Sequence, residues 1–334
     1  MSSSLLYSVL SIAAFAATTT AHSQAEDPWV VYAGGDGPGA KKHVVLVAGD
    51  EEYRSEEALP ALARILAVRH GFRCTVLFSV NGEGAIDPDA RTRIPGLDKL
   101  EDADMLVLFT RFRTLPDEDM RWIAEYVDSG RPLIGIRTAT HAFAFPEDSQ
   151  SAYASWRWNA PDGGFGGRIL GETWVRHHGR HGSESTRGVV VGSHPILRGV
   201  ENVWGPTDVY GIRTLPEDAT VLVEGAVLAG MTPEAQPVED DRNRPRMPII
   251  WIRERKLDDG AEQRILCSTI GASVDLKNQD LRRLFVNAVY WGVGLEKAIP
   301  KASDARLVGP FEPTMFGFGA FTPGVRPASL QLKR

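Results

Sequence analysis

A short apolar run, Pro132 to Ile136, breaks off abruptly into the polar sequence Arg-Thr-Ala-Thr-His at residues 137–141. An apolar run of this length without polar alternation is typical of a strand buried on both faces of a parallel sheet. Gly135, just before the break, indicates a sharp turn from strand to helix. Ligands of open α/β sheets bind beyond the carboxyl ends of the strands, so this turn predicts part of a binding site. The alternative is a plain connection in which Arg137 and His141 pair with nearby carboxylates.

Apolar runs of the same kind recur along the chain and alternate with helical patterns. One predicted helix starts at Ser55 or near Pro60 and ends before Gly71, and a second follows Pro116 and ends at Gly130. Further regular structure is predicted over residues 43–48, 74–80, 104–110, 188–191, 220–228, 248–252 and 264–269, with a last helix over 280–295. This alternation predicts an α/β sandwich with a largely parallel central sheet.

The first 25 residues have the pattern of an export signal. Leu5 to Ala17 is apolar, three threonines interrupt it, and Ser23-Gln24-Ala25 offers a small-x-small cleavage site. An uncleaved membrane anchor is the alternative, although the apolar run is short for a span. We therefore expect a periplasmic or secreted protein with a lead-in at 26–41, one domain at 42–300 and a tail at 301–334 that wraps the domain.

Bulk composition narrows the class of protein. The net charge of −6 includes no basic stripe, so nucleic acid is not expected as a partner. The only cysteines, Cys74 and Cys267, lie in predicted strands and are too few for a disulfide framework. Buried free thiols are the first expectation, with one bridge left open.

The region from Ser149 to Gly182 differs from the rest because it is rich in Trp, Gly and His. Linkers seldom carry three tryptophans, so we expect an ordered insertion at the sheet edge. Its cluster of His177, His178 and His181 invites a divalent-metal site as a minor alternative. Neighbouring glycines and arginines disfavour metal, so no cofactor is predicted and the loop is expected to contact substrate directly.

Charged residues follow three predicted strands at the point where each strand ends. Asp50, Glu51 and Glu52 could hold sugar hydroxyls or supply a base, and the alternative is a solvated acidic turn. The arginines Arg111, Arg113 and Arg137 offer paired donors for an anion or an oxyanion. They could equally pair with the acidic turn, and for Arg137 we expect both: a carboxylate holds it while it faces the pocket.

Two further groups complete the candidate site. Asp208 and Tyr210 are separated by one residue, so an extended backbone puts both side chains on one side. That pair is a candidate for acid/base work. The tryptophans Trp156, Trp158 and Trp174 could stack on sugar faces, although packing in the core is the commoner use of Trp.

Several motifs together resemble the ThuA-like, or trehalose-utilisation, family of the class I glutamine amidotransferase-like superfamily. The resemblance covers roughly Lys42 to Ile299 and implies a flavodoxin-like fold and a role in carbohydrate metabolism on oxidised (keto) sugars. It rests on the stretches VVLVAGDEEYRSEE, DADMLVLFTRF, GRPLIGIRTATHAF, GGFGGRILGETWVRHHGRHGSESTRG, HPILRG, WGPTDVYG and LRRLFVNAVYWGVGLE.

The resemblance also excludes one kind of chemistry. Amidotransferases of the superfamily place a catalytic Cys on a Gly-x-Cys-x-Gly elbow, and the matching triplet here is Gly135-Ile136-Arg137. Because Arg stands where the nucleophile would be, a thiol acyl-enzyme and glutamine hydrolysis are not expected at this position.

We therefore predict an exported hydrolase, lyase or isomerase that acts on a saccharide or keto-saccharide by acid/base chemistry. His141 or His178 would carry the proton, Asp208 would be its partner or a second base, and Arg137 would stabilise developing charge. Expected substrate contacts are Asp50, Glu52, Tyr53, Arg111, Trp174 and Tyr210. The rival is a non-catalytic periplasmic carbohydrate-binding protein. Neither hypothesis includes a membrane span after signal cleavage, and both leave homo-oligomer formation open.

Overall fold

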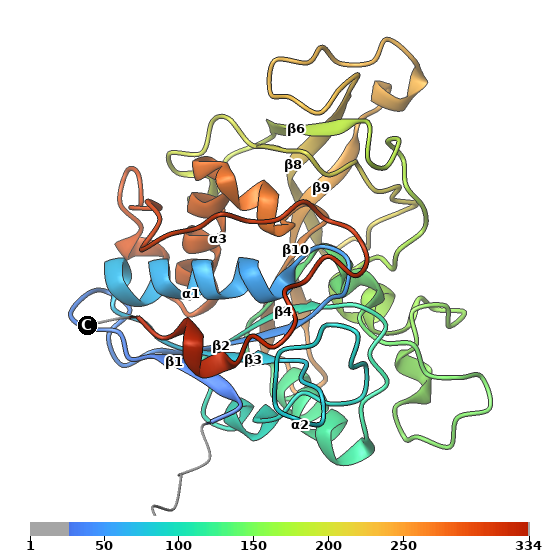
Figure 1. The fold of residues 1–334 in the computed structure, drawn as a ribbon. Helices are drawn as coiled ribbons and strands as arrows, with labels where there is room; N and C mark the ends of the chain where they lie inside the picture. The colour runs from blue at the N-terminus through green and yellow to red at the C-terminus, as the bar shows by residue number, and fades with distance from the viewer. Residues whose placement is uncertain (1–26, 333–334) are drawn as a thin grey trace, which may run out of the picture.

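The structure is a computed structural model that describes residues 27–332 (Figure 1). The predicted export signal at residues 1–25 lies outside this range and stays a prediction. Within the described range, no helix combines the length and the apolar character needed to cross a membrane.

A ten-stranded mixed sheet runs through the described residues, in the order β1-β3-β2-β4-β5-β10-β9-β8-β6-β7. Its strands are β1 (Trp29–Tyr32), β2 (His43–Gly49), β3 (Arg73–Phe78), β4 (Met105–Thr110), β5 (Leu133–Ile136), β6 (Ser185–Val190), β7 (Trp204–Gly205), β8 (Ala219–Leu228), β9 (Met247–Lys256) and β10 (Glu262–Ser268). The strands predicted before residue 137 are all present, within a few residues of their expected bounds. The predictions did not include β1 or β7.

Half of the sheet is parallel and half is antiparallel. Strands β3, β2, β4, β5 and β10 run parallel to one another. The outer strand β1 and the series β9, β8, β6 and β7 pair antiparallel. The expectation of a largely parallel sheet is therefore correct only for the first half. Beyond it, the short turn between β9 and β10 makes those two strands antiparallel neighbours.

Three α-helices cover the parallel half, with α1 (Ser55–His70) and α3 (Gln279–Gly292) on one face and α2 (Asp117–Asp128) on the other (Figure 1). Successive residues of β2 face these layers alternately, because Leu46 packs with the first layer and Val47 with the second. Single-turn helices connect the elements: η1 (Leu97–Leu100), η2 (Arg137–His141), η3 (Ala154–Trp156), η4 (Gly166–Leu170), η5 (Pro195–Leu197), η6 (Asp241–Asn243), η7 (Ser273–Lys277), η8 (Glu296–Ala298) and η9 (Pro327–Leu330).

Residues 301–332, here called the C-terminal strap, run over the α1 and α3 face and return to the start of the domain (Figure 1). Near its end, the Tyr32 hydroxyl donates a hydrogen bond to the carbonyl of Leu330 at 2.9 Å. Near its middle, the backbone N–H of Gly317 donates to the carbonyl of Glu52 at 2.8 Å. The second contact brings the strap to the turn that follows β2.

Candidate functional site

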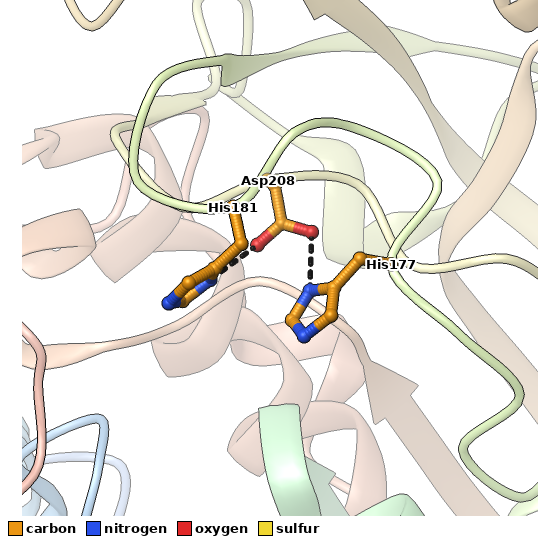
Figure 2. A group of neighbouring side chains, drawn as sticks. All are labelled: His177, His181 and Asp208. Carbon is orange, nitrogen blue, oxygen red and sulfur yellow. Dashed lines mark hydrogen bonds and ion pairs between the residues drawn. The ribbon is translucent and has the colours of Figure 1, made fainter.

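A buried carboxylate, Asp208, is the centre of a polar group formed by loops that are distant in sequence. His177 Nδ1 lies 2.8 Å from one Asp208 oxygen, and His181 Nδ1 lies 3.2 Å from the other. Arg137 Nη2 lies 3.0 Å from that second oxygen. Figure 2 shows both imidazoles approaching the carboxylate with Nδ1 and pointing Nε2 away from it. The two rings therefore share one carboxylate.

The shared carboxylate decides which nitrogen of each ring carries a proton. An ionised carboxylate only accepts hydrogen bonds, so Nδ1 of His177 and of His181 is the donor in each contact. In a neutral His177, the lone pair on Nε2 then points away from the carboxylate and can accept a proton. Each side chain is 36% exposed, whereas the Asp208 side chain is fully buried. The arrangement suits proton transfer at Nε2.

Asp208 stays charged although it is buried. Burial alone would raise the pKa of this carboxyl, but hydrogen bonds from His177 and His181 and the charge of Arg137 together hold the pKa well below its usual range. A pKa lowered in this way keeps Asp208 ionised near neutral pH, where its two oxygens accept the hydrogen bonds of both rings.

Arg137 is fully buried and holds Asp208 in place by hydrogen bonds. Its Nη1 donates to the backbone carbonyls of Asp208 at 2.8 Å and Thr269 at 2.5 Å. The guanidinium lies 4.4 Å from the ring centre of Tyr53 and 3.9 Å from that of Tyr210. A carboxylate holds Arg137 as expected, but the side chain does not face a pocket. It positions Asp208 and has no exposed surface for a substrate.

The local backbone explains how these residues meet. Arg137 follows β5 directly and adopts a left-handed conformation with φ of 47°, which turns the chain sharply after the strand. On the opposite loop, the N–H groups of His178 and Gly179 both donate to the carbonyl of Val209. A Cβ atom on Gly179 would lie 3.2 Å from Cβ of Asp208, so glycine lets this loop approach the carboxylate closely.

The two histidines predicted to carry a proton are placed differently from that expectation. His178 turns away from Asp208, and its Nε2 donates to the carbonyl of Arg242 at 2.8 Å. His141 is buried beneath Trp174, and burial together with nearby Arg111 and Arg137 holds its pKa well below the usual range. His177 and His181, which the sequence suggested only as metal ligands, hold the positions expected for a proton carrier.

The acidic turn after β2 divides into structural and site residues. Asp50 is buried and accepts hydrogen bonds from Thr138 and from backbone N–H groups. Glu51 pairs with Arg111 at 2.6 Å and with Arg113 at 2.7 Å. Of these two residues, only Glu51 therefore pairs with arginine, and because both side chains are buried, neither the solvated turn nor a free carboxylate is found at Asp50 and Glu51.

Glu52 is the acidic residue that reaches the histidines. One oxygen lies 3.4 Å from His181 Nε2, and the other lies 3.4 Å from Nε of Arg111. His181 therefore has a carboxylate oxygen beside each of its ring nitrogens. Arg111 is partly exposed and lies at the edge of the group, where it could meet a substrate.

Aromatic side chains surround the imidazoles. Trp174 packs edge-on against His177 with ring centres 5.8 Å apart, and Trp158 lies 5.8 Å beyond it. Tyr53 and Tyr210 have almost no exposed surface. They pack against the Arg137 guanidinium and are not accessible to a substrate. Trp156 is partly buried and packs against the core, with its ring centre 5.3 Å from that of Phe165, as the structural alternative for Trp predicts.

His177, His181 and Asp208 offer three ligand atoms within 4.8 Å of one another, which is the one arrangement of described residues that could hold a metal ion. His178, part of the predicted metal alternative, is not in it. Both Asp208 oxygens already accept hydrogen bonds from imidazole, and the Arg137 guanidinium lies 3.0 Å from one of them. A cation bound to Asp208 would displace these bonds next to a fixed positive charge, so the geometry favours proton transfer.

Residues 44–292 match the model of a protein family described as ThuA, trehalose utilisation. A ThuA-like protein from Bacteroides uniformis is 13% identical with a TM-score of 0.49, over 78% of this chain and 95% of that one. A ThuA-like protein from Parabacteroides merdae is 14% identical with a TM-score of 0.49, over 75% and 90%. The glutaminase domain of Trypanosoma brucei CTPS is 9% identical with a TM-score of 0.35, over 80% and 100%. No curated protein matches the sequence.

Proposed function

The chain belongs to the ThuA family of trehalose utilisation, which is related to carbohydrate use, and from this premise we propose an enzyme that acts on a saccharide or keto-saccharide by acid/base chemistry. The observation that carries the proposal is the pair of imidazoles oriented by one buried carboxylate, Asp208. A pair of proton carriers suits a hydrolase, a lyase or an isomerase, because each must take a proton from one atom and give one to another.

The two rings are suited to different roles. His177 contacts a carboxylate through Nδ1 alone, so its Nε2 is the proton acceptor in the proposal. His181 has Asp208 beside Nδ1 and Glu52 beside Nε2, and carboxylates only accept hydrogen bonds. A proton on both nitrogens satisfies both contacts, so His181 is the proposed proton donor.

Nucleophilic catalysis by cysteine is not part of the proposal. Cys74 and Cys267 are completely buried in β3 and β10, and burial raises the pKa of both thiols. Neither lies at the group around Asp208. Export of the protein belongs to the proposal as well and rests on the composition of residues 1–25.

A non-catalytic carbohydrate-binding protein is the second candidate. The half-exposed Trp174 beside His177, with the half-exposed Trp158 next to it, favours this candidate, since such rings also suit a site that only binds. Turnover separates the two candidates.

The test is a screen of the purified protein against disaccharides, including trehalose, and keto-saccharides. For any substrate found, His177→Ala and His181→Ala should each lower kcat by about 100-fold or more, the usual scale for a lost proton carrier. His178→Ala is the matched control, since its ring bonds to the Arg242 carbonyl, and kcat should stay within about twofold. Equal losses in all three variants would contradict the assignment. Binding without turnover across the panel would favour the carbohydrate-binding protein.

A further inference from the structure

We propose that the C-terminal strap supplies a saccharide-stacking subsite that selects which saccharide binds, formed by Phe316 beside His181 and by Phe318 beside Arg111. This inference rests on the proposed function. It concerns residues that come after the region matched by the family, which ends at residue 292.

Phe316 places the strap in contact with the histidine group. Its ring centre lies 5.1 Å from that of His181 and 5.5 Å from that of Tyr53. The ring is half-buried, so one part packs on the protein and the rest lines the approach to His181. Phe316 therefore lies beside His181, as Trp174 lies beside His177.

Phe318 is the exposed member of the pair. Its side chain is 64% exposed, the largest value for a large apolar side chain in the described part of the chain. Its described aromatic or cationic neighbour is Arg111, whose guanidinium carbon lies 5.1 Å from the ring centre. Arg111 also contacts Glu52, which in turn contacts His181. The exposed ring is thus two side chains away from the proposed proton donor.

An exposed aromatic ring next to charged donors suits a sugar. The ring face is apolar and matches the C–H face of a pyranose, while the guanidinium can donate to hydroxyl groups. Keeping Phe318 in water forgoes the stabilisation of burying an aromatic side chain. An exposed apolar group at the edge of a polar site is typical of a ligand-binding surface.

The strap is held firmly enough to serve as a binding surface. Thr314 bonds to the Glu57 carboxylate through its N–H at 2.9 Å and its hydroxyl at 2.8 Å. Three residues further on, the Gly317 N–H bonds to the Glu52 carbonyl. These two anchors flank Phe316 and fix it relative to α1 and to the turn after β2. The subsite is therefore formed before a ligand arrives.

The experiment measures trehalose and methyl α-glucoside binding by isothermal titration calorimetry, and KM and kcat for any substrate found. Phe318→Ala should raise the Kd for trehalose and the KM by about tenfold while kcat stays within about twofold. Phe318→Trp should restore binding, because it keeps a stacking face. Met315→Ala is the matched control, since Met315 is an apolar residue of the same strap that is 46% exposed, and this variant should bind like the wild type.

Two results would overturn the subsite. One is a Phe318→Ala protein that binds within about twofold of the wild type, and the other is a wild type that binds neither sugar. The proposed function fails separately: if His177→Ala and His181→Ala keep full turnover while Phe318→Ala weakens binding, the subsite stands and the acid/base assignment is wrong.

Discussion

Arg137 donates two hydrogen bonds to Asp208, from Nη2 to the carboxylate at 3.0 Å and from Nη1 to the backbone carbonyl at 2.8 Å. Both side chains are fully buried. The pair joins the turn after β5 to the segment after β7, so the orientation of the imidazoles depends on a contact inside the protein. Loss of Arg137 should therefore affect folding as well as turnover.

Arg137→Met is expected to lower the free energy of unfolding by about 3–5 kcal/mol, because it leaves the Asp208 charge buried without its cation. Urea denaturation measures the change. Arg121→Ala is the control, since Arg121 is exposed, pairs with Glu125 and lies over the Trp122 ring at 4.3 Å, and its loss should cost about 1 kcal/mol or less. Unchanged stability in Arg137→Met would show that Asp208 does not depend on this partner.

Glu56 should make stability decrease as pH rises. Burial raises its pKa to about 8 from an ordinary 4.5, with the charge of Arg54 opposing the shift. Between about pH 4.5 and 8 the folded protein then holds a proton that the unfolded chain releases. The resulting loss is at most about 1.4 kcal/mol per pH unit.

Glu56→Gln should therefore flatten the dependence of the unfolding free energy on pH in this window and stabilise the protein at pH 8. Denaturation curves at pH 5, 6.5 and 8 measure this. The exposed Glu83→Gln serves as control and should leave the slope unchanged. An unchanged slope in Glu56→Gln would mean that Glu56 is ionised in the folded protein at neutral pH.

The double substitution Cys74→Ala with Cys267→Ala should keep kcat within about twofold and cost about 1–3 kcal/mol of stability through lost packing. The thiols cannot form the bridge left open by the sequence. Strands β3 and β10 are separated by β2, β4 and β5, a spacing of roughly 19 Å that exceeds the reach of a disulfide. Loss of turnover in a folded double variant would contradict the acid/base assignment.

Chelation distinguishes proton transfer from metal catalysis at His177, His181 and Asp208. Overnight dialysis against EDTA should leave kcat unchanged, and the protein as purified should contain less than about 0.1 equivalent of zinc or manganese by elemental analysis. Activity that disappears with EDTA and returns with one equivalent of zinc would identify these residues as metal ligands.

The first half of the fold could be predicted because its strands carry their own signal. β2, β4 and β5 are uninterrupted apolar runs and every residue in them is buried. The direction of later strands could not be predicted in this way, because an apolar run has the same composition whichever way it runs. The turn at residues 257–261 sets that direction, because it joins β9 to β10 as antiparallel neighbours.

The site was predictable as residue types but not as partners. Asp208 and the histidine cluster stand out in the sequence, but they lie on irregular loops. Such loops have no helical or strand periodicity, so the direction of each side chain could not be predicted. Backbone bonds from His178 and Gly179 to Val209 decide this, and they direct His178 away from the carboxylate. The sequence did not indicate that Phe316 belongs to the site, because this depends on the path of the C-terminal strap over the domain.

The candidate site combines residues from the parallel and the antiparallel halves of the sheet. Glu52 and Arg137 belong to turns of the parallel half, whereas Asp208 follows β7 at the far edge of the antiparallel half. A ligand that contacts Glu52 and the two histidines bound to Asp208 can bind only to protein in which both halves of the sheet are packed together. A ligand that binds only the intact protein stabilises it against unfolding. At a sugar concentration of 100 times the Kd, separating the two halves would cost about 2.7 kcal/mol more than without sugar. Bound sugar therefore favours unfolding of the two halves in one step.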